Sequence, residues 1–321
     1  MRFLLLGGIG YLGGRLAGHL KAQGHTVDIT TRRPPAEAPA WVCADLIARW
    51  DGHTAAELRP LLEEADVAVH MAAADQETAA QDPPGAFHTS AATAWRLMEA
   101  VKGCSRPPTV IYVSTIHVYG RIAGNITETS PAAPVHPYAL ARRFGEEVIE
   151  MFRRHGSTPA LCVRLANSFG CPAGKEVSQW PLAFNDFCRQ AATQNTIVLK
   201  SAGTQRRNFI TLGDAARALE LLAARRDGWP ADGIIHVGSR LSYSIREAAE
   251  LVAGRAAEMW GIRPEIQVPA AASGAVGQQE FTFSTARLEA LGFTWTNAVE
   301  QEVDDTLRLS ASAFGRYCAS S

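Results

Sequence analysis

The sequence has no excess of charge, no long apolar run and no paired cysteines. Its 31 basic and 32 acidic residues leave a formal net charge of −1, which argues against a nucleic-acid binder that relies on a basic face. No apolar run approaches the roughly 20 residues that a bilayer-spanning helix needs. We therefore expect a soluble, cytoplasmic protein with neither a nucleic-acid nor a membrane partner.

The cysteines are scattered and form no C-x-x-C pair. In a chain of 321 residues, this spacing is typical of reduced cytosolic thiols rather than of a disulfide framework or a zinc site. We therefore predict no metal site. The six residues are Cys43, Cys104, Cys162, Cys171, Cys188 and Cys318.

Short apolar segments alternate with helical ones in the first half of the chain. This alternation predicts an α/β fold with a doubly wound parallel sheet and helices on both faces. The predicted strands are Arg2–Leu6, Thr26–Thr30, Trp41–Cys43, Val67–Met71, Val110–Ser114 and Ala160–Leu165. The predicted helices are Gly14–Gln23, Ala86–Val101 and Tyr138–His155.

A glycine pattern, G-x-x-G-x-x-G, directly follows the first predicted strand and contains Gly7, Gly10 and Gly13. Such glycines permit a tight turn, a close approach of backbone to a pyrophosphate, and close packing of helix on strand. The helix N-terminus then presents free N–H groups to the phosphates. A glycine-rich turn without a ligand is the alternative, but this context favours a dinucleotide site in a Rossmann-type fold, in which we include Tyr11 and Leu12.

The end of the second predicted strand bears on the type of dinucleotide. NAD sites usually carry Asp or Glu there, which accepts hydrogen bonds from the adenosine ribose. This chain has Thr31 at that position, followed by Arg32 and Arg33. Arginine pairs with a 2′-phosphate through charge-assisted hydrogen bonds. We therefore favour NADP(H) over NAD(H), with a solvated basic turn as the alternative.

The pattern becomes less regular after Asn167, which indicates a second, smaller α/β lobe. The strand-like segment Gly233–Gly238 is expected to return to the main sheet, and Phe281–Trp295 with the tail is expected to close the smaller lobe. We predict a dinucleotide-binding domain at 1–170, with 210–240 returning to it, and an interleaved substrate-binding lobe at 171–209 and 241–321.

A predicted helix that begins near Pro137 carries Tyr138 and Arg142 on one face, because they are four residues apart. A fixed cation stabilises a nearby phenolate, which prepares a tyrosine for general acid–base catalysis. For Tyr138 alone, the alternative is a half-buried aromatic with a satisfied hydroxyl.

With these motifs, the sequence resembles the extended short-chain dehydrogenases/reductases, or NAD-dependent epimerase/dehydratase family, over almost its whole length. The further matching segments are Asp45-Leu46, His70-Met71-Ala72-Ala73, Ser114-Thr115 with Tyr119-Gly120, Tyr138, the stretch Arg164, Asn167 and Gly170, and Gly203–Ile210. The resemblance implies that Asp45 and Leu46 lie beside the adenine. It also implies that Ala72 and Ala73 lie beside the nicotinamide ribose.

The resemblance further implies that Thr115 and Tyr138 are catalytic, with Arg142 at the family's lysine position as a catalytic and cofactor-binding residue. Thr115 and Asn167 would also contact the substrate, and Arg207 would hold its diphosphate. We add His117 to the substrate residues, as an auxiliary acid or as a hydrogen-bonded structural histidine.

Three departures from the family pattern restrict the reaction. The motif Y-x-x-x-K has Arg142 in place of lysine, and Ser90 stands at the family's usual asparagine. Sugar 4,6-dehydratases carry Asp-Glu after the catalytic threonine, whereas this chain has Ile116 and His117, which argues against that elimination.

We therefore expect an NADP(H)-dependent oxidoreductase that reduces a keto group on a nucleotide-activated sugar, with a reductase of a non-sugar carbonyl as a variant. A nucleotide-sugar epimerase is the first alternative, and a catalytically weak cofactor-binding protein, suggested by Arg142, is the second. We also expect a homodimer, because family members pair the helices that match Ala86–Val101 and Tyr138–His155.

Overall fold

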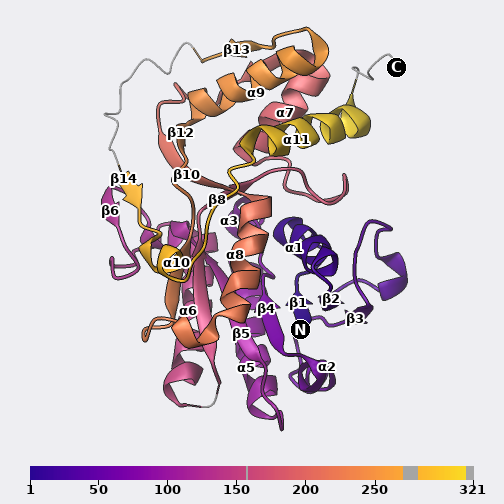
Figure 1. Cartoon of the computed structure of the whole chain (residues 1–321), viewed down its shortest axis with the longest axis vertical. Coiled ribbons are helices and arrows are strands. Elements are labelled where there is room, and N and C mark those ends of the chain that lie inside the picture. The colour runs from indigo at the N-terminus through magenta and orange to yellow at the C-terminus, as the bar shows by residue number, and fades with distance from the viewer. Residues whose placement is uncertain (157, 270–280, 316–321) are drawn as a thin grey trace.

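The structure, a computed structural model, describes residues 1–156, 158–269 and 281–315. Its largest element is a seven-stranded parallel sheet (Figure 1). The strands are β1 (Arg2–Leu6), β2 (Thr26–Thr31), β3 (Leu46–Arg49), β4 (Val67–His70), β5 (Thr109–Thr115), β7 (Ala160–Leu165) and β11 (Ile234–Val237). Their order is β11-β7-β5-β4-β1-β2-β3, which confirms the predicted Rossmann-type fold.

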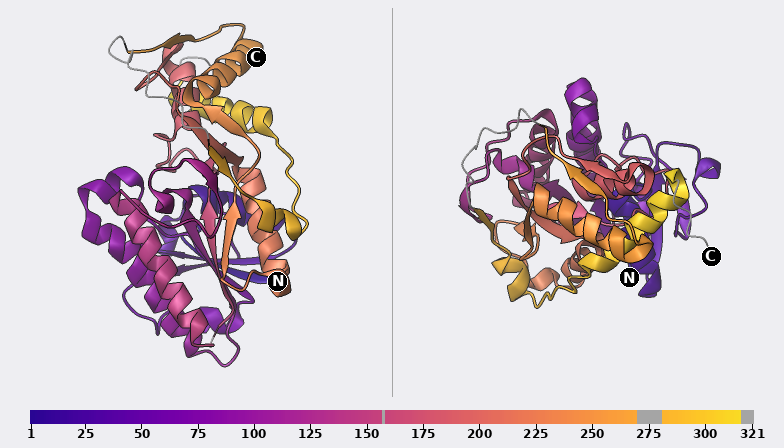
Figure 2. Two further views of the ribbon diagram at one scale, coloured as in Figure 1. Left: turned by 90° about the vertical axis from the view of Figure 1, so that its left-hand side faces the viewer. Right: turned by 90° about the horizontal axis from the view of Figure 1, so that it is seen from above.

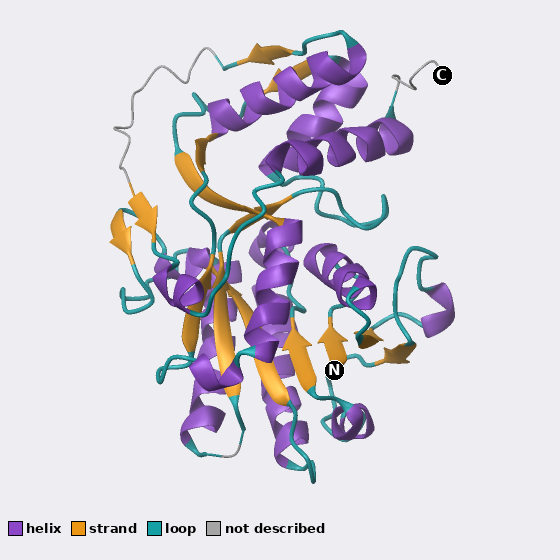
Figure 3. Ribbon diagram, in the orientation of Figure 1, coloured by secondary structure: helices purple, strands orange, loops and turns teal. Residues whose placement is uncertain are grey.

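Helices cover both faces of the sheet (Figure 3). The central strands are therefore buried on both sides, between two apolar layers. Phe3 and Leu5 of β1 pack with α1 (Tyr11–Ala22) and α8 (Leu212–Ala224). Leu4 and Leu6 belong to the opposite layer, which is formed by α2, α5 and α6. The bounds of these three helices are Arg59–Glu64, Thr93–Lys102 and Pro137–Arg154.

A smaller lobe stands at the carboxyl ends of the strands (Figure 2). Its helices are α7 (Ala183–Gln194), α9 (Ile245–Trp260) and α11 (Val299–Phe314). Its strands are β8 (Asn167–Phe169), β9 (Thr196–Val198), β10 (Arg206–Thr211), β12 (Ser242–Ser244) and β13 (Glu265–Gln267). The lobe has its own core, in which the Phe169 and Phe184 rings stack with centroids 4.1 Å apart.

The segment Phe281–Trp295 corrects our expectation that it closes the smaller lobe. Its strand β14 (Phe281–Phe283) pairs with β6 (Gly124–Ile126), and Phe283 and Leu288 belong to the core of the sheet domain. The helix α10 (Ala286–Ala290) continues this packing. After it the chain re-enters the lobe through α11.

The third strand also lies elsewhere than predicted. Trp41–Cys43 is a loop, and the strand is β3 at the sheet edge, where Leu46 is 41% exposed. The large side chain of Trp41 has a role outside the sheet. Its ring packs against Gly14, and its indole N–H donates to Glu176 at 2.9 Å.

The predicted helix Ala86–Val101 is composite. It consists of α4 (Pro83–Phe87), a π-helical turn (His88–Ala92) and α5. Short helices complete the fold: α3 (Gln76–Gln81) and the 3₁₀ turns Pro35–Glu37, Ile116–Tyr119 and Arg226–Gly228.

Within the described residues, none of the helices is long and apolar enough to cross a membrane, and no cluster of His, Cys, Asp or Glu is arranged to hold a metal ion. The five described cysteines are free thiols. Cys318 lies outside the described residues.

Candidate active site

The glycine turn lies where β1 and β4 end side by side, which is the switch point of the sheet. Gly7 has a φ of +93°, and a Cβ there would lie 2.9 Å from the backbone nitrogen of Ala72. A Cβ on Gly13 would lie 2.2 Å from the carbonyl oxygen of Gly7. Side chains at these positions would fill the turn, so the bare backbone at the start of α1 fits a pyrophosphate.

Tyr11 and Leu12 present only backbone to that turn. The Tyr11 hydroxyl donates to the Gly170 carbonyl at 2.8 Å, and burial raises the pKa of this phenol well above its ordinary value. Leu12 packs against the apolar cores. The Tyr11 side chain therefore joins the two lobes, and the predicted cofactor contact of Tyr11 falls to its backbone N–H.

The basic turn after β2 is open to solvent. The Thr31 hydroxyl accepts a hydrogen bond from the Arg33 backbone N–H at 3.1 Å, which fixes the turn. Arg32 and Arg33 are exposed, and neither side chain has an ion-pair partner within the described ranges.

The predicted role of Asp45 and Leu46 requires a correction. These residues lie at the amino end of β3, whereas the glycine turn lies at the carboxyl ends of the parallel strands. Asp45 accepts hydrogen bonds from the Val27 backbone N–H and from Lys21, both at 2.8 Å, and these contacts lower its carboxyl pKa, with Lys21 the larger cause. Leu46 is the first residue of β3. The prediction failed because it placed the third strand about five residues too early.

The acid that follows the true end of β3 is Asp51, which becomes our candidate for the adenine contact. It lies at the same edge as the glycine turn, because all seven strands of the sheet are parallel. One of its carboxylate oxygens accepts a hydrogen bond from the His53 backbone N–H at 3.0 Å. Correct placement of the edge strand would have identified it.

Thr115 ends β5, and its hydroxyl accepts a hydrogen bond from the His117 backbone N–H at 3.3 Å, which starts the 3₁₀ turn. Tyr138 lies in the first turn of α6, where its backbone N–H donates to the His136 ring at 3.2 Å. The rings of His117 and Tyr138 lie edge to face with centroids 6.3 Å apart. The strand end and the helix start thus bring the predicted catalytic segments together.

Arg142 is 4% exposed and belongs to the same site. Its guanidinium donates to the carbonyls of Met71 and Ala72, both at 3.1 Å, at the end of β4. Burial opposes its charge, but the phenols of Tyr112 and Tyr138 outweigh that effect and raise the pKa of Arg142. Ala73 follows in the same strand end and is half-buried.

His117 and Arg207 lie in surroundings without negative charge. Burial, Arg207 and His136 lower the pKa of His117 to about 4, so its imidazole is neutral near pH 7. Its ring contacts the Gln76 side-chain amide at 3.2 Å. Desolvation lowers the pKa of Arg207, and this residue has no acidic partner among the described residues. The side chain is nevertheless exposed, and an exposed cation without an acidic partner suits an anionic ligand.

Asn167 lies where β8 pairs with β10, and its side chain donates to the Asn208 carbonyl at 2.9 Å. This contact fixes the strand that carries Arg207. The structure therefore gives Asn167 a positional role beside that arginine.

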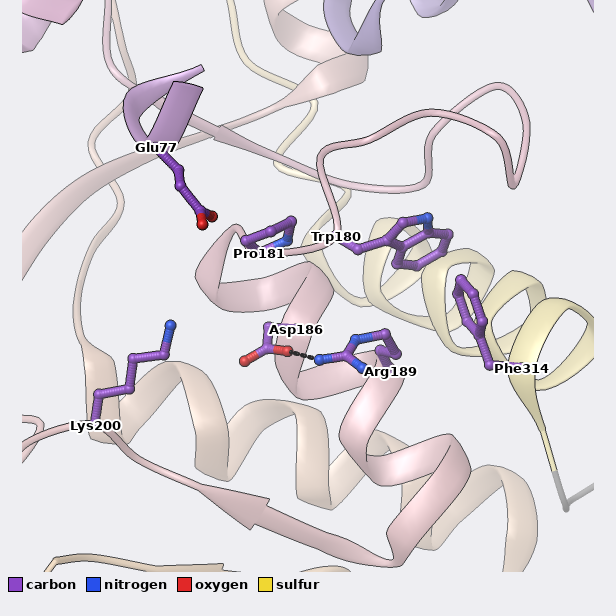
Figure 4. Close-up of a pocket in the computed structure, with 7 residues that line it drawn as sticks. All are labelled: Glu77, Trp180, Pro181, Asp186, Arg189, Lys200 and Phe314. Atoms are coloured by element: carbon purple, nitrogen blue, oxygen red, sulfur yellow. Dashed lines mark hydrogen bonds and ion pairs between the residues drawn. The ribbon is translucent and has the colours of Figure 1, made fainter. Parts of the chain in front are cut away.

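A pocket of about 450 Å³ opens between α3 and the smaller lobe (Figure 4). The Trp180 ring forms one wall, and Asp186 pairs with Arg189 on the floor. The lining residues are Glu77, Trp180, Pro181, Asp186, Arg189, Lys200 and Phe314. Glu77 follows Gln76, which touches His117, so the pocket adjoins the site around Tyr138. The sequence analysis did not identify this pocket.

Residues 3–238 match the family described as the NAD dependent epimerase/dehydratase family. The chain is 27% identical over 319 residues to a dTDP-6-deoxy-L-talose 4-dehydrogenase (NAD(P)(+)) of Kitasatospora kifunensis, with 97% of this chain and 96% of the relative covered. It is 26% identical over 269 residues to a UDP-glucose 4-epimerase of Mycolicibacterium smegmatis, covering 79% and 82%.

Solved structures share the fold. MoeE5 in complex with UDP-glucose and NAD superposes with a TM-score of 0.74 at 22% identity, covering 97% of this chain and 98% of the other. RMD from Pseudomonas aeruginosa complexed with NADPH gives a TM-score of 0.77 at 22% identity, covering 97% and 99%.

Substitutions of Asp51 and Asp45 test which of these two acids contacts the adenosine part of the cofactor. We expect Asp51→Ala to weaken NADPH binding about fivefold to tenfold, as for the loss of one hydrogen bond to the ligand. Asp45→Ala should leave affinity within about twofold, because this acid lies at the far edge. Titration of NADPH fluorescence measures both, and the reverse order of effects would restore Asp45 to the site.

Proposed function

Because the chain belongs to the NAD-dependent epimerase/dehydratase family, we propose that it is an NADP(H)-dependent oxidoreductase that reduces a keto group on a nucleotide-activated sugar. The observation that carries the proposal is the convergence of Thr115, Tyr138 and Arg142 with the glycine turn at one edge of the sheet. The Kitasatospora relative, a sugar-nucleotide 4-dehydrogenase by name, supports it over most of both chains.

A bound nicotinamide would supply hydride to a carbonyl carbon, or accept it from the corresponding alcohol carbon in the reverse direction. The protein itself would supply the proton for the substrate oxygen and a fixed positive charge beside the proton donor. Tyr138 gives its phenolic proton to the oxygen that develops negative charge, and the Thr115 hydroxyl donates a hydrogen bond to the same oxygen. Arg142 supplies a fixed positive charge beside the phenol, since its interaction with Tyr138 favours the charged guanidinium.

For the substrate, we assign the nucleotide end to the smaller lobe. Arg207 has no acidic partner in the described part of the chain, its charge acts on His117, and it suits the diphosphate. The adjoining pocket offers the Trp180 ring and the Lys200 ammonium, groups that can stack on a base and pair with a phosphate (Figure 4). His117 and Asn167 would lie between this end and Tyr138.

An epimerase that oxidises and then reduces the same carbon remains the second candidate. The similarity to the Mycolicibacterium UDP-glucose 4-epimerase favours it, and the same three residues would act. The epimerase would differ from the reductase in retaining its dinucleotide through the catalytic cycle. We also propose a cytoplasmic location, which fits the free thiols of the described cysteines and which cell fractionation tests.

The test of function uses purified protein with NADPH and keto-sugar nucleotides. Tyr138→Phe should abolish turnover but leave NADPH bound, because phenylalanine keeps the ring and loses the proton. Arg207→Ala should raise KM about tenfold or more with little change in NADPH affinity, since lost phosphate binding weakens ground and transition states together. Turnover without net NADPH consumption would identify the epimerase instead.

The cofactor preference rests on the basic turn. We expect the double variant of Arg32→Ala and Arg33→Ala to weaken NADPH about tenfold or more and NADH barely, because only NADPH carries the 2′-phosphate. The relatives do not decide this, because the structures named above hold NAD in one case and NADPH in another. Equal affinities that the double variant leaves unchanged would show a solvated turn.

We propose a homodimer through α5 and α6. Four apolar side chains of these helices are exposed: Trp95 (39%), Leu140 (38%), Phe144 (49%) and Met151 (36%). A self-complementary helix pair would cover them. Light scattering should give a dimer mass at micromolar concentration, and Phe144→Glu should shift it toward monomer, whereas the exposed Phe314→Glu should not. A monomeric wild-type protein would contradict the proposal.

A further inference from the structure

The buried charge of Arg142 has an unusual set of partners. No carboxylate among the described residues forms an ion pair with it, and the side chains that favour its charge are the phenols of Tyr112 and Tyr138. Two carbonyls of the β4 end accept from its terminal nitrogens, while Nε has no hydrogen-bond partner in the described structure. A buried guanidinium normally needs a countercharge or a full set of acceptors.

Tyr112 supplies the remaining support from the floor of the site. The guanidinium carbon of Arg142 lies 5.5 Å from the centre of the Tyr112 ring, within cation–π range. The Tyr112 hydroxyl also donates to the Arg142 carbonyl at 3.3 Å. One fully buried tyrosine thus contacts both the charged end and the backbone of Arg142.

The surroundings of Tyr112 are built to admit its phenol. A Cβ on Gly145 would lie 2.0 Å from the Tyr112 hydroxyl, so a residue with a side chain at this point of α6 would displace it. On the other side, the His70 ring lies 5.2 Å from the Tyr112 ring, and its Nε2 is within 2.7 Å of the Thr93 hydroxyl. Burial and the charge of Arg142 lower the pKa of His70 to about 3, so it adds no competing charge.

We propose that Tyr112 is the positioning residue for Arg142, its ring taking the place of a carboxylate countercharge and its hydroxyl fixing the helix backbone. Arginine can then stand where a lysine is usual in the family, with its planar fork held by the carbonyls of Met71 and Ala72 and its positive charge beside the nucleotide site. The link to the nucleotide rests on the proposed function, whereas the link between Tyr112 and Arg142 does not.

The first readout is a double-mutant cycle in the protein without ligand. Tyr112→Leu and Arg142→Met are combined, and thermal unfolding is measured for each single variant and for the double variant. We expect coupling: Tyr112→Leu should lower the midpoint clearly in the wild-type background and much less beside Arg142→Met. Additive shifts would overturn the positioning role, whatever the protein binds.

The second readout is NADPH affinity. Tyr112→Leu should weaken it about fivefold to thirtyfold, as expected for loss of a desolvated cation–π contact, and Tyr112→Phe, which keeps the ring, should recover most of it. Beside Arg142→Met, neither change should matter further. Arg142→Lys should also bind NADPH more weakly, because an ammonium does not match the two carbonyls and the ring.

Tyr119→Leu is the matched control for Tyr112→Leu. Tyr119 is also buried, with a guanidinium, that of Arg164, 4.9 Å from its ring centre, but it does not contact Arg142. It should lower stability and leave NADPH affinity unchanged; an equal loss of affinity would overturn the proposal, as would stronger NADPH binding by Arg142→Lys. Wild-type protein that binds neither NADPH nor NADH, yet shows the coupling in unfolding, would refute the proposed function and leave Tyr112 as the support of Arg142.

Discussion

The buried face of α6 sets the main physical constraint on this molecule. Tyr138, Arg142 and Glu146 follow one another at four-residue steps, so a single helical face carries a phenol, a cation and an anion into the protein. Glu146 is 1% exposed and receives two hydrogen bonds from the buried Arg164, at 3.1 and 2.8 Å. Despite burial, Arg164 therefore holds the pKa of Glu146 below its ordinary value. Arg142 has no carboxylate partner among the residues that the structure describes and depends on carbonyls and an aromatic ring instead.

This difference separates structure from chemistry along one helix. In the buried ion pair between Glu146 and Arg164, the two charges compensate each other. The pair joins α6 to β7 beneath the site, and breaking such a buried pair is costly. Arg142, one turn nearer the helix start, keeps a net charge at the edge where β4 ends. A net charge in a dry site acts strongly on whatever approaches it, here the Tyr138 phenol and the bare backbone of the glycine turn.

The sequence predicted the structure best at positions where a single physical requirement selects a single residue type. Gly7 was predicted from the tight turn and Gly13 from close packing of helix on strand, and in the structure a Cβ on either residue would lie within 2.9 Å of backbone atoms. The edge strand was misplaced because strand β3 is half-exposed, so it lacks the continuous apolar pattern of a central strand. The loop before β3 carries Trp41, whose ring packs against Gly14 in α1, a residue distant in the sequence. Such long-range contacts leave no local pattern.

The same limit explains why the link between the two lobes was missed, although its residues lie in the most recognisable motif. Tyr11 was assigned to the cofactor because of its place between two glycines, yet its hydroxyl bonds the Gly170 carbonyl of the smaller lobe. One turn later, Arg15 donates to both carboxylate oxygens of Glu302 in α11, at 2.9 and 2.6 Å, and to the Cys171 carbonyl. The helix that begins at the glycine turn is therefore also the one that holds the smaller lobe. A group bound at the glycine turn and a group bound in that lobe must accommodate the same rigid element, which fixes the distance between the two halves of the site.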